Sequence, residues 1–221
     1  MTLLINLGLW QLQRAEFKRG LELQLELREV AASMPITELS DKRFANYTGL
    51  HVHGRLTPVA NHYLLLDNQT YNGKVGYLAY QLMRAENGEN LLFEMGFISA
   101  LSSRQWLPKV DWLRFEDNFE GRLYQRTVNP LSSSLELEPG AVGRIQNLNF
   151  DELEKRWGLR IKPYMFQPQS EDWPYPQPWQ PIALGSERHF GYAIQWFGLA
   201  FALLCLSLWA WIGYVVRKKD D

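Results

Sequence analysis

The sequence contains almost no cysteine and has no excess charge of either sign. Cys205 is the one cysteine among 221 residues, so no disulfide can form within the chain. No cysteine pair is available to hold zinc, copper or a covalently attached haem. The 23 basic and 24 acidic residues leave a net charge of -1 at pH 7, which makes nucleic acid an unexpected partner.

The motifs of common catalytic sites are also missing. The sequence has no Gly-x-Ser-x-Gly, no glycine-rich phosphate loop and no His-Glu-x-x-His. His51 and His53 alternate on a predicted strand and share a face, with His62 nearby, but no Cys or acidic residue stands at a spacing typical of metal ligands. We interpret these as solvent-facing strand histidines and predict that the protein is not an enzyme.

A long apolar segment near the C-terminus is the clearest positive feature. From Tyr192 to Val216 no charged side chain occurs, and three basic residues follow. About 25 helical residues measure ~37 Å, enough to cross a hydrocarbon core of ~30 Å. We predict a transmembrane helix over 189–216, with the basic tail 217–221 in the cytoplasm and everything before Arg188 on the exported side.

The N-terminal segment 1–12 is apolar apart from Asn6 and Gln11, but it covers only about half of a membrane crossing. It lacks the basic region and the cleavage site of a signal peptide. Two interpretations stand: the segment lies at the membrane interface, or Met1 is an internal start and the segment is the outer half of a longer signal anchor. We favour the second and predict a partial first transmembrane helix over 1–12.

Residues 13–34 are predicted to continue as a helix that leaves the membrane. Trp10, Arg14 and Lys18 recur every four residues and therefore share a face, with Trp10 positioned to stack under Arg14. Such a face is typical of anchoring at the membrane rim. The leucines that follow alternate with Glu and Gln, which fits a strand by period, but these residue types favour a helix. Met34-Pro35 is expected to end it.

Residues 35–166 are predicted to form an exported, mostly-β domain, either an antiparallel sheet or a small barrel with short helices. Runs rich in aromatic, β-branched and leucine residues are separated by Asn, Asp and Gly. Asn87-Gly88 predicts a hairpin with positive φ at both turn positions. Asn149 with Glu152 predicts the start of a short helix that Gly158 ends. The predicted strands are 44–56, 62–66, 75–84, 91–99, 119–127 and 160–166.

Residues 167–188 form a predicted linker that is rich in proline and aromatic residues. Five prolines between positions 168 and 181 favour an extended path that donates few backbone hydrogen bonds. The aromatic residues, among them Trp173 and Trp179, either dock this linker on the barrel or lie in the lipid headgroup layer.

His189 lies at the outer end of the predicted membrane helix, within reach of a ligand at the membrane surface. A neutral imidazole is a good axial ligand for haem iron. Trp196 follows seven residues later on the same helix face, with Tyr192 and Gln195 close to that face. Alternatively, His189 caps the helix or lies among lipid headgroups.

Two stretches carry a resemblance to a known family. The stretch from His189 through Tyr192-Ala193 to Trp196-Phe197 resembles the signature that opens the second membrane helix of the Surfeit locus protein 1 family. The stretch Gly8–Lys18 resembles the signature at the exit from that family's first membrane helix. The resemblance covers essentially the whole chain and implies a helix, an exported mostly-β domain that includes Gly54, and a second helix.

This resemblance implies a function. Members of the family assist the assembly of haem-copper cytochrome c oxidase, and some bacterial members are thought to bind haem a and pass it to the oxidase large subunit. The implied location is the bacterial cytoplasmic (inner) membrane, with the central domain on the periplasmic side. The implied partners are the oxidase large subunit, the haem a synthesis machinery and the lipid bilayer.

The resemblance also assigns residues to this function. His189 becomes the expected contact to the haem iron, and Trp196 becomes its neighbour in a haem a site. The residues expected to face a partner are Trp10, Gln11, Arg14, Lys18 and Tyr192.

The chain departs from the family pattern in two places. The usual Asn-Arg-Gly-Trp of a central strand is Glu94-Met95-Gly96-Phe97 here, which replaces both the basic residue and the tryptophan. Most of the first membrane helix is absent. A rival interpretation stays open, in which the protein is a docking chaperone that binds oxidase subunits, never binds haem, and uses His189 only as an interfacial anchor.

Overall fold

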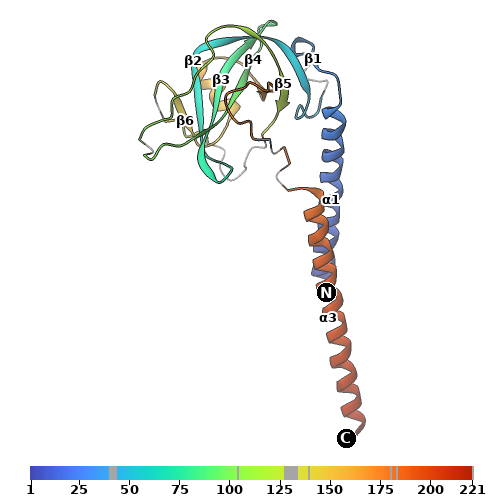
Figure 1. The fold of residues 1–221 in the computed structure, drawn as a ribbon. Helices are drawn as coiled ribbons and strands as arrows, with labels where there is room; N and C mark the ends of the chain where they lie inside the picture. The colour runs from blue at the N-terminus through green and yellow to red at the C-terminus, as the bar shows by residue number, and fades with distance from the viewer. Residues whose placement is uncertain are drawn as a thin grey trace. The chain divides into compact units, whose positions relative to one another are not determined.

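The computed structural model describes residues 1–39, 44–103, 105–126, 134–138, 140–179, 181–182 and 184–220. The chain divides into two compact units. Arg28–Pro181 forms the barrel unit, and Met1–Leu27 with Ile182–Asp221 forms the helix unit (Figure 1). Some residues of three predicted segments lie outside the described residues: Thr127 of the strand 119–127, Gln180 and Ala183 of the linker 167–188, and Asp221 of the tail 217–221.

The main strands of the barrel unit form a closed circuit. β2 (His51–Tyr71) pairs with β3 (Lys74–Ala85), β3 with β4 (Asn90–Ser99), β4 with β7 (Ile161–Pro168), β7 with β5 (Asp117–Tyr124), and β5 returns to β2. Two short strands, β1 (Met34–Pro35) and β6 (Gly143–Ile145), add to β2, and a 3-10 turn, η1 (Ile36–Glu38), follows β1. The predicted mostly-β domain is confirmed, and its sheet closes on itself as a small barrel (Figure 1).

The sheet is mixed rather than antiparallel. β4 and β7 run parallel, with Leu92 beside Met165, and β1 and β6 also run parallel to β2. The prediction of an antiparallel sheet is wrong in this respect. The direction of a strand depends on the connection that leads into it, and the residues of β7 carry no signal of that direction.

β2 is one strand of 21 residues where two strands were predicted. Asn61 and Asn68 have positive φ, at 62° and 56°, at the two places where the register between β2 and β3 shifts. The polar residues predicted to separate two strands are therefore bulges, which bend one long strand around the barrel. Residues 44–50, also predicted as strand, form turns before it.

The two hairpin turns differ in the conformation of their asparagine. Asn72-Gly73 joins β2 to β3 with φ of 47° and 74°, as in a two-residue hairpin turn with both residues left-handed. At Asn87-Gly88 the hairpin is confirmed, but only Gly88 has positive φ, at 84°. The Gly88 N–H donates to the Ala85 carbonyl at 2.9 Å. The prediction of positive φ at both residues is therefore wrong for this turn.

The hydrophobic core has two layers because both faces of the central strands are apolar. Leu65 of β2 packs inside the barrel, whereas its neighbours Leu64 and Leu66 pack on the outer face with α2 (Phe150–Trp157). α2 begins and ends as predicted. Asn149 Oδ1 accepts the Glu152 N–H at 3.1 Å, and Gly158 has φ 65°.

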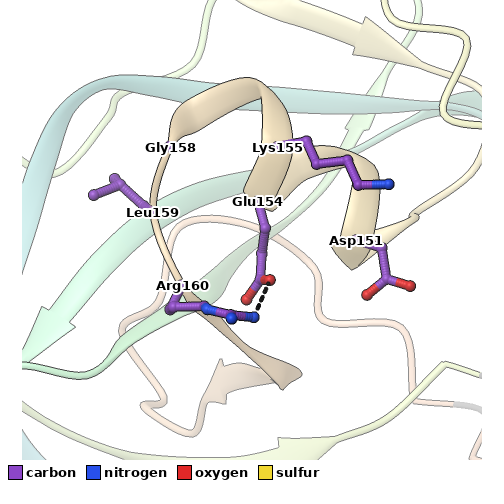
Figure 2. A pocket seen from close by; sticks show the side chains of 6 residues that line it. All are labelled: Asp151, Glu154, Lys155, Gly158, Leu159 and Arg160. Carbon is purple, nitrogen blue, oxygen red and sulfur yellow. Dashed lines mark hydrogen bonds and ion pairs between the residues drawn. The ribbon is translucent and has the colours of Figure 1, made fainter.

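A hollow beside α2 is lined by residues of this helix and of the turn that follows it, and two of them form an ion pair with each other (Figure 2). Glu154 Oε1 accepts the Ile161 N–H at 2.7 Å, and Glu154 Oε2 pairs with Arg160 at 3.2 Å. Because this carboxylate already holds the turn into β7, we assign the hollow a structural role.

Residues 173–179, called the strap below, dock on the barrel along β4. Met95 lies at a β-bulge of β4 and is not paired with a residue of β3. Its carbonyl accepts the Trp173 indole N–H at 2.6 Å and a Gln177 amide N–H at 3.0 Å. The Phe97 N–H donates to the Pro176 carbonyl at 2.8 Å. Of the two interpretations of the linker's aromatic residues, docking on the barrel therefore holds for Trp173.

The helix unit is an antiparallel pair of helices. It contains α1 (Thr2–Glu29), apart from its last two residues, and α3 (Ser186–Asp220) (Figure 1). Gly8 lies so close to Phe197 that a Cβ at position 8 would be 2.7 Å from the ring. Ala15, Ala193 and Ala200 are also buried. These small residues, seven apart on each helix, form a seam along which α1 and α3 are in contact, and Gly8 makes room for the Phe197 ring.

α3 confirms the predicted apolar helix near the C-terminus. Within the described residues, Ser186–Val215 is the one helical stretch long and apolar enough to cross a membrane, and an 18-residue window within it has a mean hydropathy of 1.9. α1 is helical as predicted, and its leucine-rich second half is helix rather than strand. It ends at Glu29, however, and not at Met34-Pro35, which form β1, so the predicted end of this helix is wrong. The membrane crossing of its first 12 residues stays a prediction.

Gly96→Ala is expected to destabilise the barrel unit. Gly96 has φ 124°, and a Cβ there would lie 2.7 Å from the Pro176 carbonyl oxygen, so the substitution strains the backbone and displaces the strap. We expect the free energy of unfolding to fall by about 1–3 kcal/mol, measured by chemical denaturation of the detergent-purified chain. Gly20→Ala on α1, where a Cβ meets open space, is the control and should be neutral or slightly stabilising. Equal losses in both variants would contradict the role assigned to Gly96.

Candidate functional site

The helix pair brings together His189 and Gln11, both of which the sequence singles out. His189 Nδ1 lies 2.8 Å from Gln11 Oε1, and the ring is half-buried. An amide oxygen can only accept, so Nδ1 donates its proton and Nε2 of the neutral ring keeps a lone pair. An imidazole held in this way is oriented to bind a metal through Nε2.

Two aromatic side chains share the flank of α3 that carries His189. Tyr192 and Trp196 follow it by three and seven residues, which places them near one line along the helix. Trp196 is half-buried and Tyr192 is exposed. The flank is therefore an aromatic, partly open surface beside the imidazole.

α1 adds basic groups to the same flank. Arg14 and Lys18 follow Gln11 by three and seven residues and so lie on its side of α1. The Arg14 guanidinium carbon lies 5.7 Å from the ring centroid of Trp10, which confirms the predicted stacking of this pair. One flank of the helix pair thus combines an oriented imidazole, aromatic rings and two cations.

A carboxylate that the sequence did not single out closes the outer end of the pair. Glu22 Oε1 accepts the Ser186 N–H at 2.8 Å, and Oε2 accepts the Ser186 hydroxyl at 2.5 Å. Because Ser186 is the first residue of α3, Glu22 satisfies a free helix N–H and places a negative charge at the positive end of the helix dipole. These hydrogen bonds lower the pKa of Glu22 from its ordinary value of 4.5.

A second carboxyl group, also missed by sequence reasoning, is buried under the strap. Glu94 accepts the Tyr80 hydroxyl at 3.1 Å and a Gln167 amide N–H at 2.9 Å. Gln167 also donates to the Pro178 carbonyl of the strap at 3.1 Å. Burial raises the pKa of Glu94. Glu94 belongs to the stretch that departs from the family pattern, so this departure forms part of the attachment of the strap.

Arg122 extends this network to the end of the strap. Its Nε donates to Gln167 Oε1 at 2.8 Å, and its guanidinium carbon lies 3.6 Å from the ring centroid of Trp179. Burial raises the pKa of the Tyr124 phenol to about 12, and the Tyr124 ring contacts Trp179 edge-on. The network holds the strap by stacking and by hydrogen bonds.

Among the residues that the structure describes, the strand histidines do not form a common site, and the buried His51 Nε2 has no hydrogen-bond partner. His53 Nδ1 lies 3.0 Å from the Ser33 hydroxyl, and the His62 ring packs edge-on against Trp157. His51 is mostly buried, with Nε2 3.8 Å from a carboxylate oxygen of Glu29, so its interpretation as solvent-facing is wrong. In the described ranges, no three His, Cys, Asp or Glu side chains are grouped to hold a metal ion.

The fold and the site define a class: a protein with a barrel domain, a helix able to cross a membrane, and an oriented imidazole on its helix pair. The chain belongs to the SURF1 family, the Surfeit locus protein 1 family, which it matches over residues 1–201. The resemblance found in the sequence is thereby confirmed. A comparison with individual curated proteins finds no match. The SURF1 family is membrane-associated, and its members are assembly factors of cytochrome c oxidase rather than known enzymes.

Glu22→Gln is expected to loosen the start of α3 at neutral pH. The folded-state pKa of Glu22 is lowered, so its stabilising effect is present above 4.5 and disappears as the pH falls through the lowered value. We expect amide hydrogen exchange of residues 189–192, corrected for intrinsic rate, to be about two- to fivefold faster in the variant at pH 7. The difference should vanish in acid, and one that persists there would show that the charge of Glu22 is not responsible.

Proposed function

We propose that this chain is a membrane-anchored assembly factor of cytochrome c oxidase that binds haem a at His189 and passes it to the oxidase large subunit. The observation that carries the proposal is the hydrogen bond from His189 Nδ1 to Gln11, which leaves Nε2 free for iron. Membership of the SURF1 family supports the oxidase as the destination.

The residues of the His189 flank fit haem a chemically. The macrocycle occupies four positions on the iron, so one protein imidazole is sufficient to hold the metal. Trp196 and Tyr192 offer aromatic surface to the ring, and Arg14 and Lys18 offer cations to its carboxylates. The apolar side chains of α3 that follow would accompany the long hydrocarbon tail into lipid. When bound, haem a would supply the redox-active iron that the oxidase needs, and the chain would supply only the holding groups.

We further propose that the barrel unit lies on the periplasmic side of a bacterial inner membrane. The basic residues Arg217 and Lys218 follow the apolar stretch of α3, and such residues favour the cytoplasmic side. The first part of α1 would enter the same bilayer. The contact of Gly8 with Phe197, inside the apolar stretch of α3, supports this placement.

The large subunit would meet the flank that carries the haem. Trp10, Gln11, Arg14, Lys18 and Tyr192 are the residues proposed for that contact. Trp10 and Tyr192 are 48% and 44% exposed, which leaves them available to a partner. Haem transfer then requires exchange of the His189 ligand for one of the large subunit.

His189→Ala is expected to abolish haem a retention. The chain would be co-expressed with haem a biosynthesis and purified in detergent, and its absorption spectrum would be compared with that of the variant. Wild type should retain about one haem per chain, and His189→Ala should lose it or show a shifted spectrum. His53→Ala, which removes an exposed barrel histidine, is the matched control and should keep the haem.

Gln11→Leu tests the oriented imidazole separately. The substitution keeps the volume but removes the acceptor of the Nδ1 proton, and we expect about tenfold weaker haem binding. Wild type that purifies without colour and still captures the oxidase large subunit would overturn haem binding in favour of the docking chaperone.

A further inference from the structure

The helix unit carries a groove on the side of the α1–α3 seam opposite His189. Leu12 and Phe190 each follow one residue after the bonded pair Gln11 and His189, a turn of about 100° around each helix. They line, with Ala15 and Leu23, a groove of about 850 Å³. Phe190 is 54% exposed and Leu23 is 56% exposed. This apolar surface is therefore accessible and lies apart from the proposed haem flank.

The rim of the groove is strongly acidic. Glu16, Glu22, Glu26 and Glu187 line it, and Arg19 is the one cation among its described lining residues. Four carboxylates against one guanidinium leave a local net charge of -3, whereas the whole chain carries only -1. Glu22 is occupied by Ser186, so the other three carboxylates are available to a partner.

Apart from Leu23, the apolar residues of the groove lie at one end of it, and the carboxylates extend from Glu16 to the other end. The apolar part at Leu12 and Phe190 lies toward the apolar stretch of α3, and the groove extends along α1 to Glu26. Fourteen helical residues measure ~21 Å, or about four turns. A phosphatidylethanolamine headgroup carries one amine, so a single headgroup cannot pair with carboxylates spread over this length. A second helix with several cations on one face can.

We propose that this groove docks a membrane-spanning helix of a partner protein whose first turns outside the membrane carry Lys or Arg on one face. The apolar end of the groove receives the last apolar turn of that helix, and Glu16, Glu26 and Glu187 pair with its cations. The charge complementarity selects this occupant, since an acidic helix is repelled and a neutral one leaves three carboxylates unpaired. The proposal does not rest on haem binding at His189.

The test uses a synthetic helix of about 20 apolar residues followed by two turns that carry three lysines on one face. A second probe carries glutamine in place of each lysine. Binding of each labelled probe to the full chain is measured by energy transfer in phosphatidylcholine vesicles, which have no net charge. We expect the lysine probe to bind wild type about tenfold more tightly, as two or three exposed ion pairs allow, with a preference that weakens as salt rises.

Variants locate the interaction. E16Q/E26Q/E187Q should lose the preference for lysine, and the control E120Q/E171Q/D172N, which removes three exposed carboxylates of the barrel unit, should keep it. The reversed variant E16K/E26K/E187K should prefer a probe with glutamate in place of lysine. Such a gain of preference could not result from a folding defect. His189→Ala should leave all these results unchanged, so failure of haem binding and failure of this proposal are distinguishable.

Three results would overturn the proposal. Equal binding of the lysine and glutamine probes to wild type would show that the carboxylates do not attract a partner. A lysine preference that survives in E16Q/E26Q/E187Q would place the attraction elsewhere. The third result is energy transfer between two differently labelled copies of the chain that is lost in E16Q/E26Q/E187Q, while wild type shows no preference for the lysine probe. It would assign the groove to self-association.

Discussion

Close contact between α1 and α3 is the constraint on which the helix unit depends. Gly8 provides the space that the Phe197 ring occupies, and the buried alanines continue the same seam. Without this approach, Gln11 could not hold the His189 imidazole and Glu22 could not reach Ser186. Packing of small residues thus comes first, and the polar contacts that define the site follow from it.

In the barrel unit, the main constraint is attachment of the strap, a proline-rich segment that can donate few backbone hydrogen bonds. The bulge at Met95 frees a carbonyl from the β3–β4 ladder, and Trp173 and Gln177 use it. Under the strap, Glu94 is buried with Tyr80 and Gln167 around it. The side-chain polar atoms of Glu94, Tyr80 and Gln167 all have hydrogen-bond partners, which makes burial of the carboxyl group tolerable.

Much of this architecture could be predicted from local sequence. The apolar stretch of α3, the capped helix α2 and most strands depend on patterns within a few residues. Parallel pairing of β4 with β7 and the bulges of β2 depend on distant partners, so they were missed or misassigned. In the site, family motifs located His189 and Gln11, but these residues lie far apart in the sequence, so their contact could not be predicted from local patterns. Glu22 had no local signal, whereas the seven-residue spacing of Gly8 and Ala15 could have revealed the seam.

The group behind the imidazole has a consequence for how firmly a metal can be held. Many metal-binding histidines donate to a carboxylate, whose negative charge makes the ring a stronger donor to the metal. His189 donates instead to the neutral amide of Gln11. The ring is oriented but gains less electron density than a carboxylate would provide, so an iron bound there would be ligated correctly yet released more readily. Such a ligand suits a carrier, which must give up what it holds, better than an enzyme that keeps its cofactor.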